Sequence, residues 1–390
     1  MYDRIHFISY WPRFSGITQS SVIPTIAYLI KQGIANHIFL YTREIDISKN
    51  QKHEMLKVSW CPALIGRFEN SGLQLIETTI SFLNLIRNEP RQKSLIIARG
   101  ATAGGIAWFI SKLTRIPFIV ESFEPHSAYM TESGVWPKNS LKARLQRYLE
   151  KKQIINACAL ITVSRAYTEL LQAEYKQLSN VYTIPCTVSF QMFNLKHPGE
   201  LYQNILNAGY HLSADTKIGI YVGQFGDIYY KEEFFELLAS LQNQDPNFFQ
   251  IILTPKPDLV YDLIEDYKIN KQQVMAKAVD WTDIPLYLRI ADFGICLVRQ
   301  SKHKRFCSPI KTGEYMAAGL PTLISKDIGD DSEFIEQNNI GWVVDISNKE
   351  HLNFILPSKT SMKEAERIRT TSYPFKSRDN CFKVYNQIFT

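Results

Sequence analysis

A lysine and a glutamate stand three residues apart in the stretch CSPIKTGEYMAAGLP. Ser308 is a good N-cap residue and Pro309 suits the first helical position, so we expect a helix that begins here. Gly319 suits the left-handed residue that ends such a helix. Lys311 and Glu314 then lie near an N-terminus whose free N–H groups and dipole attract anions. The stretch therefore predicts an anion-binding site.

The same pair has a simpler interpretation, as an exposed i,i+3 ion pair that contributes roughly a few tenths of a kcal/mol. The flanking sequence favours a site instead. Residues 292–298 and 320–325 read as short buried strands on either side of the helix. A helix between two strands of a parallel sheet presents its N-terminus at the carboxyl edge, where α/β folds bind their ligands.

Strand-like and helix-like segments alternate along both halves of the chain. Amphipathic stretches such as 20–31, 73–87 and 141–155 separate the apolar runs. This alternation predicts an α/β protein with two parallel sheets, one in each half, and helices on both faces of each sheet. The predicted strands are 4–10, 37–41, 94–98, 117–121, 160–164 and 181–185 in the first half, and 217–223, 249–254, 273–279, 292–298, 321–325 and 341–345 in the second.

The chain is also too long, at 390 residues, for a single hydrophobic core. A polar, turn-rich stretch at 186–200 marks the break, so we expect a first domain at 1–190 and a second at 191–370. The segment 371–390 predicts a C-terminal helix that can pack back on either domain, the first being the expected one. Two doubly wound domains that face each other leave a cleft, where we expect the ligand to bind.

Several common chemistries lack their signatures. The glycines at 100–105 and 223–226 do not form GxGxxG, and no Walker A loop occurs. The eight histidines and six cysteines show neither HxxxH nor CxxC spacing, so we expect no metal ion and no other cofactor. Without a signal-like N-terminus or a long uncharged apolar run, the sequence predicts a cytoplasmic protein.

Positive charge is concentrated in one stretch, Lys138–Lys152, which holds six basic residues and one acid. It can be a solvated helix face. It can also attract an anionic membrane surface or an acidic substrate, which would place the protein at the inner face of a membrane. Nucleic acid is a less suitable partner, because the stretch lacks interleaved aromatic residues and any recognisable binding module.

With two domains expected, the segment SPIKTGEYMAAGLP resembles the donor-binding segment of the group 1 glycosyltransferases, retaining enzymes of the GT-B fold. Weaker similarities follow in the family's usual order at 14–20, 160–164, 217–233, 283–295 and 329–345. The resemblance implies two Rossmann-like domains, a nucleotide-sugar donor and transfer of its sugar to a carbohydrate or lipid-linked acceptor. It also implies that protein cations and N–H groups, without a metal ion, stabilise the leaving diphosphate.

The resemblance assigns roles on the donor side. Glu314 would accept hydrogen bonds from the ribose hydroxyls, and Lys231 stands where the family has a phosphate-binding lysine. Lys311 and the helix start at Ser308 and Pro309 would add positive potential. The two glycine loops contribute as well, since Gly16 would let the first-domain loop approach the diphosphate without a Cβ clash. The second-domain loop contributes Gly223 and Gln224.

In the first domain, His126 follows a strand at its carboxyl end and resembles the histidine that contacts the donor sugar, a catalytic role it would share with Lys231 and Glu314. Glu124 is a weaker candidate beside it, and Tyr129 and Trp136 would line the acceptor site. Each has a structural alternative: a lone histidine is more often part of the packing, aromatic residues fill loops, and a lysine that opens a helix is usually solvated.

Two positions depart from the family pattern. Phe306 stands where the family often carries a second glutamate, eight residues before the ribose one, and Gln224 replaces the usual arginine. These departures leave the donor sugar open and motivate a non-catalytic sugar-nucleotide-binding subunit as one alternative. A nucleotide-sugar epimerase, which shares the two-domain architecture, is the other.

Overall fold

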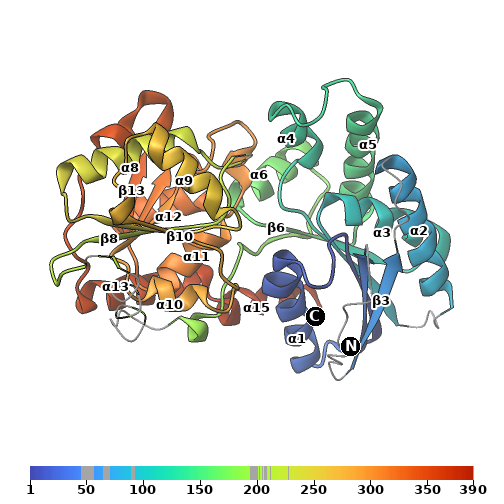
Figure 1. Ribbon diagram of the computed structural model, residues 1–390. Coiled ribbons are helices and arrows are strands. Elements are labelled where there is room, and N and C mark those ends of the chain that lie inside the picture. Colours follow the sequence, from blue (N-terminus) through green and yellow to red (C-terminus); the bar gives the residue numbers. More distant parts are fainter. Residues whose placement is uncertain are drawn as a thin grey trace. The chain divides into compact units, whose positions relative to one another are not determined.

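The computed structural model describes residues 1–44, 57–64, 71–88, 93–193, 209–210, 212–226 and 228–389, together with the single positions 201, 203 and 205. The chain divides into two compact units. Unit 1 comprises Met1–Ile184 and Phe382–Thr390, and unit 2 comprises Pro185–Cys381. Each unit is built on one parallel β-sheet with helices on both faces (Figure 1), which confirms the predicted fold class.

The sheet of unit 1 has seven strands in the order β3-β2-β1-β4-β5-β6-β7, all parallel. Its central strands are buried along almost their whole length, because helices cover both faces of the sheet. The strands are β1 (Tyr2–Ser9), β2 (Ala35–Glu44), β3 (Val58–Leu64), β4 (Ser94–Arg99), β5 (Phe118–Glu121), β6 (Ala159–Thr162) and β7 (Val181–Thr183).

All six strands predicted in this half are present, and β3 is an additional one. Pro62 lies within β3, and a proline argues against a central strand because it cannot donate to the ladder. The topology removes this objection, because β3 is the edge strand of the sheet and pairs only with β2.

The helices of unit 1 divide between the two faces of its sheet. In Figure 1, α1 and α15 lie on one face, and α2, α3 and α5 lie on the other. Tyr28 of α1 packs against Phe382 and Tyr385, which joins the C-terminal segment to unit 1. The helices are the π-helical turn η1 (Thr18–Val22), α1 (Ile23–Lys31), α2 (Ser71–Arg87), α3 (Ala101–Thr114), α4 (His126–Glu132), α5 (Leu141–Asn156), α6 (Arg165–Glu174) and α15 (Lys383–Ile388).

A buried ion pair lies at the carboxyl ends of β4 and β5. The Arg99 guanidinium donates to the carboxylate of Glu121 and to the hydroxyl of Ser21. The Tyr385 hydroxyl donates to the other oxygen of Glu121. The last helix of the chain is therefore tied to the edge of the sheet at which the candidate residues of unit 1 lie.

The sheet of unit 2 has six parallel strands in the order β10-β9-β8-β11-β12-β13, and all six were predicted from apolar runs. They are β8 (Ile218–Val222), β9 (Phe249–Leu253), β10 (Val274–Lys277), β11 (Phe293–Cys296), β12 (Thr322–Ser325) and β13 (Gly341–Val344). Successive residues of these strands face opposite sides. Ile220 of β8 belongs to one hydrophobic cluster and Tyr221 to another, one on each side of the sheet.

Helices cover both clusters. Those that pack on the Tyr221 side are α8 (Glu232–Gln244) and α9 (Pro257–Asp266). Those on the Ile220 side are α10 (Ile284–Leu288), α11 (Ile310–Ala317), α12 (Gly329–Gln337) and α13 (Met362–Lys376). Short helical turns complete the unit: η2 (Phe190–Met192), η3 (Lys271–Gln273), η4 (Lys304–Phe306), η5 (Ile346–Asn348), η6 (Glu350–Asn353) and α14 (Arg378–Cys381).

The chain passes between the units at Ile184–Pro185 and again at Cys381–Phe382. Part of the predicted linker, 194–200, lies outside the described residues. The expected C-terminal helix is three helices: α13 and α14 belong to unit 2, and α15 to unit 1. None of the helices in the described ranges combines the length and the apolar character that a membrane crossing requires.

Candidate functional site

The helix expected after the Ser-Pro pair is α11, between β11 and β12. It ends as predicted, since Gly319 follows it with a φ of 75°. Its start differs from the prediction, which was wrong about Ser308 as the N-cap. The N-cap residue is Pro309, the helix begins at Ile310, and no side chain caps it.

The Ser308 hydroxyl is bound elsewhere, in a buried polar cluster that joins three helices. It accepts a hydrogen bond from the Lys376 ammonium at 2.7 Å and donates to Asp331 at 3.0 Å. Lys376 also forms an ion pair with Asp331 at 2.6 Å, and both side chains are almost fully buried. Thr312 donates to the same carboxylate. The start of α11 is thus fixed by residues of α12 and α13, and Ser308 has a structural role in the folded protein.

Lys311 lies in an aromatic environment and is only 3% exposed. Its Nζ is 3.6 Å from the ring centroid of Tyr229 and 4.3 Å from that of Tyr221. Within the described part of the chain, this ammonium has no hydrogen-bond partner. It lies directly under the loop after β8, because a Cβ added to Gly223 would be 3.0 Å from Nζ. A buried cation without a partner is costly, and an anion at this loop would satisfy it.

Burial shifts the pKa values of both charged residues of α11. It lowers the pKa of Lys311 to about 8, and the nearby Cys296 and Glu314 oppose this shift. Burial raises the pKa of Glu314 to about 7, against the favourable charge of Lys311. Within the described residues, no hydrogen bond satisfies the Glu314 carboxylate. The helix therefore presents one cation and one carboxylate that a ligand can stabilise in their charged forms.

Tyr315 holds α11 against the sheet. Its hydroxyl accepts from the N–H of Val222 at 3.1 Å and donates to the carbonyl of Ile295 at 3.2 Å, so it bridges β8 and β11. Gly294 makes room for this ring, since a Cβ there would lie 2.4 Å from it. The Tyr221 hydroxyl donates to the carbonyl of Gln224 and steadies the loop above Lys311. These contacts explain how the sheet positions α11, with Lys311 beside Gly223.

Two further positions singled out in unit 2 have surroundings of their own. Lys231 lies just before α8 and pairs with Glu232 at 2.9 Å, with about a third of its side chain exposed. That pairing is what a solvated lysine at a helix start would show. Phe306, at the position where the family often has its second glutamate, is buried in the core, 4% exposed.

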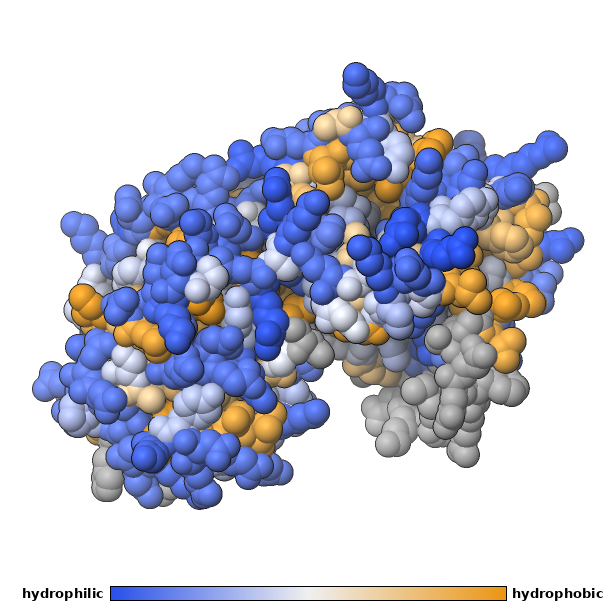
Figure 2. All heavy atoms as spheres, turned by 90° about the horizontal axis from the view of Figure 1, so that it is seen from above, coloured by the Kyte–Doolittle hydropathy of each residue, from blue (hydrophilic) through white to orange (hydrophobic). Residues whose placement is uncertain are grey.

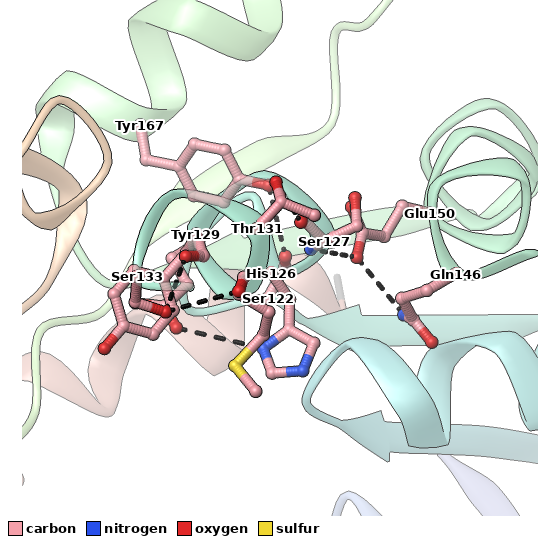
Figure 3. Close-up of polar contacts among 11 residues, drawn as sticks. Ser122, His126, Ser127, Tyr129, Thr131, Ser133, Gln146, Glu150 and Tyr167 are labelled. Carbon is pink, nitrogen blue, oxygen red and sulfur yellow. Dashed lines mark hydrogen bonds and ion pairs between the residues drawn. The ribbon is translucent and has the colours of Figure 1, made fainter. Parts of the chain in front are cut away.

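In unit 1, His126 is the first residue of α4 (Figure 3). Its ring packs edge-on against Trp136, with centroids 5.4 Å apart, and its Nδ1 is 3.9 Å from Glu124. The Trp136 ring is 9% exposed and also contacts the ammonium of Lys142. Trp136 is therefore a buried packing partner of the His126 ring. Tyr129 is also buried, 8% exposed.

Sequence reasoning missed the residue that fixes the start of α4. Glu150 of α5 accepts hydrogen bonds from the Ser127 N–H at 2.8 Å and from the Ser127 hydroxyl at 2.7 Å, and Gln146 donates to it as well (Figure 3). Burial raises the pKa of Glu150, and these hydrogen bonds oppose the shift. The one signal was that Glu150 is the single acid in a basic stretch.

Gly16 lies at the start of the helical segment after β1. A Cβ added there would meet no atom within 4 Å, so the protein itself does not require glycine at this position. Close approach of a ligand stays a prediction. Among the described side chains, no group of three or more histidine, cysteine or acidic residues is arranged to hold a metal ion.

Comparison with known proteins bears directly on unit 2. Residues 206–359 match the family described as Glycosyl transferases group 1, which confirms the resemblance predicted from the sequence. The match contains Lys231, Gly223, Lys311 and Glu314. No curated protein sequence matches the chain.

Solved structures match the whole chain. A sucrose-phosphate synthase from Thermosynechococcus elongatus has a TM-score of 0.70 at 15% identity, and WaaG, a glycosyltransferase involved in lipopolysaccharide biosynthesis, has 0.69 at 16%. HepE from Anabaena, in complex with UDP and glucose, has 0.69 at 13%. Each alignment covers 99% of this chain and 99% of the other. At these identities the likeness shows the fold, which is that of the GT-B glycosyltransferases.

Proposed function

We propose that the protein is a retaining glycosyltransferase. It would move a sugar from a nucleotide sugar to a carbohydrate or lipid-linked acceptor, without a metal ion, in the synthesis of a surface polysaccharide or glycolipid. The family match over 206–359 and the GT-B fold support glycosyl transfer as the class of activity. The observation that carries the proposal is Lys311, whose buried ammonium under the Gly223 loop has no hydrogen-bond partner among the described residues.

A diphosphate has the negative charge and the acceptor oxygens that the Lys311 ammonium does not contact among the described residues. During transfer, the bond between the anomeric carbon and the diphosphate oxygen breaks, and its electron pair stays on the diphosphate. Negative charge therefore grows during the reaction, and a desolvated cation stabilises it more strongly than water would. The acceptor oxygen forms the new bond to the anomeric carbon, and its proton passes to the departing diphosphate oxygen. Lys231 would assist at the phosphates, and His126 would contact the sugar.

Glu314 provides the sharpest test of donor binding. An ionised carboxylate accepts hydrogen bonds from ribose hydroxyls, each of which contributes roughly 1.5–3 kcal/mol when one partner is charged. Glu314→Gln keeps the shape and removes the charge, so we expect donor affinity measured by calorimetry to fall tenfold or more. Donor affinity equal to that of the unmodified protein would show that Glu314 does not hold the ribose.

The donor is identified by thermal-shift measurements against a panel of nucleotides and nucleotide sugars, because a ligand at 100 times its Kd adds about 2.7 kcal/mol of stability. UDP and UDP-sugars come first, since the HepE structures contain UDP, and one contains UDP-glucose. The anomeric configuration of the product, read by NMR, tests retention. Conversion of the nucleotide sugar without an acceptor would indicate an epimerase instead.

The buried Phe306 favours one further candidate, a subunit that binds sugar nucleotides without turning them over. Such a subunit would give a thermal shift and no donor consumption with any acceptor. We further propose that the protein acts in the cytoplasm at the inner face of a membrane, where lipid-linked acceptors are found, and that Lys138–Lys152 makes the contact. Nucleic acid is not among the proposed partners.

A further inference from the structure

The helices α3 and α5 pack against each other on one face of the unit 1 sheet and expose large apolar side chains. The clearest are Phe109 and Leu113 of α3, 42% and 53% exposed, and Leu145 and Tyr148 of α5, 50% and 51% exposed. In Figure 2, orange patches lie among blue residues at the right-hand side, over the helices of unit 1. Apolar side chains grouped in this way indicate a surface that another molecule covers.

The same two helices also carry many cations. They are Lys112 and Arg115 from the end of α3, and Lys142, Arg144, Arg147, Lys151 and Lys152 from α5. None of them pairs with a carboxylate in the described ranges. The one acid of α5, Glu150, points away from this surface and is bound to Ser127 (Figure 3). The exposed side of α5 is therefore basic and apolar together, which is the composition of helices that lie in a membrane interface.

A hollow of 330 Å³ lies between the two helices. Lys112 and Lys152 line it from opposite helices, and Trp108 and Phe118 contribute aromatic walls. Phe118 begins β5. The hollow is therefore at the amino end of that strand, whereas His126 follows its carboxyl end. It is separate from the candidate site of unit 1. The remaining lining residues are Ser111 and Asn156.

We propose that this α3–α5 face docks on an anionic phospholipid membrane, with a headgroup phosphate in the hollow between Lys112 and Lys152. The proposal rests on the membrane contact proposed above and adds its apolar anchors, its second helix and its headgroup site. It does not depend on glycosyl transfer.

The composition of the face selects the lipid surface over other partners. Two copies of the chain packed through this face would bring like charges together. Nucleic acid would satisfy the lysines but not the aliphatic side chains of Leu113 and Leu145. The favourable interaction of Lys112 with the helix dipole, in the last turn of α3, offers another reason for its position. That interaction does not explain the exposed Phe109. An interface of phosphate headgroups over acyl chains accommodates both kinds of side chain.

Two double variants test the face by co-sedimentation with phosphatidylcholine vesicles, with and without phosphatidylglycerol. Lys112→Gln with Lys152→Gln removes two charges, and Phe109→Ser with Leu113→Ser removes two apolar anchors. The matched control is Lys363→Gln with Ile355→Ser, two exposed residues of unit 2. We expect the charge variant to lose about thirtyfold in partitioning, the equivalent of about 1 kcal/mol for each basic residue at an anionic surface.

Insertion is read from tryptophan fluorescence with vesicles whose acyl chains carry bromine. We expect the fluorescence of Trp108, in the wall of the hollow, to be quenched. The Trp108→Phe variant, which keeps the other five tryptophans, should show much less quenching than the unmodified protein. Melting temperatures of all variants confirm that each is folded.

The proposal is supported if binding to anionic vesicles is sensitive to salt, is weakened in both test variants and is unchanged in the control. Equal binding to neutral and anionic vesicles, no binding, or an equal loss in the control would overturn it. Donor turnover with a water-soluble acceptor is measured in parallel. Vesicle binding without turnover would refute the proposed transferase and leave this face standing, and turnover without vesicle binding would do the reverse.

Discussion

Replacing Lys311 by methionine is expected to make the protein more stable and less able to bind its donor. The side chain is buried, charged and without a hydrogen-bond partner in the described structure. Methionine has similar length and no charge, so it fills the same space between Tyr221 and Tyr229 without the desolvation cost. A residue kept for its function, at the expense of stability, behaves in this way.

The magnitude follows from the pKa of Lys311, which burial lowers from 10.5 to about 8. A shift of this size corresponds to a cost of about 3 kcal/mol for the charged form in the folded protein. Contacts with the two tyrosine rings return part of it, so we expect Lys311→Met to gain about 1–3 kcal/mol. The gain holds below pH 8. It disappears as the pH rises from 8 to 10.5, because there only the unfolded chain keeps the proton and the unmodified protein gains stability.

Lys376→Met is the matched control, since it removes another buried lysine of unit 2, and this lysine is paired with Asp331. It leaves the Asp331 carboxylate buried without its partner, which should cost about 3–5 kcal/mol. Thermal unfolding compares the two variants, and a unit of about 200 residues shifts by roughly 2–4 °C for each kcal/mol. Donor binding is measured by calorimetry. A Lys311→Met protein that is destabilised, or that binds donor normally, would refute the role assigned to this lysine.

Three other outcomes are expected. A bound diphosphate should raise the pKa of Lys311, which is about 8 before binding, so binding near pH 8 should be accompanied by proton uptake. Calorimetry in buffers of different ionisation enthalpy measures this uptake, and equal heats in all buffers would contradict it. A chelator should leave donor turnover unchanged, and activity lost with the chelator and restored by Mg²⁺ or Mn²⁺ would count against a metal-independent reaction. Glu150→Ala should destabilise α4 by about 1 kcal/mol, as loss of a helix cap does. If α4 aligns His126, this variant should lower kcat and leave the KM for donor almost unchanged. Glu150→Gln keeps one acceptor oxygen and should restore much of the activity. A purely structural Glu150 would leave kcat unchanged in both.

The strands of both sheets could be predicted because parallel strands buried on both faces are apolar along their length. Ile218–Val222 and Phe293–Cys296 are examples, with every residue buried. The strand β3 could not be predicted in this way, because it lies at the edge of the sheet, is only partly buried and contains Pro62. Its place is set by the pairing partner β2, which local sequence does not encode.

The candidate site shows the same division between local and distant causes. Lys311 and Glu314 could be selected because three-residue spacing at a helix start is a local pattern. The prediction of Ser308 as the N-cap was wrong because its hydroxyl bonds to Asp331 and Lys376, which come 23 and 68 residues later. Glu150 was missed for the same reason, since it lies 23 residues after Ser127. Side-chain clusters assembled from distant segments leave no periodic signal in the sequence.

The contact between Tyr385 and Glu121 joins residues 264 positions apart. Unit 1 is made of two pieces of chain, and all of unit 2 lies between them. A ribosome that adds about 5–20 residues per second needs roughly 10–40 s to make the intervening segment. During that time unit 2 can fold as one continuous piece. The surface of unit 1 that α15 later covers stays exposed, and Glu121 has not yet received the hydrogen bond from Tyr385. The order of synthesis thus allows unit 2 to fold first, and unit 1 is completed only after it.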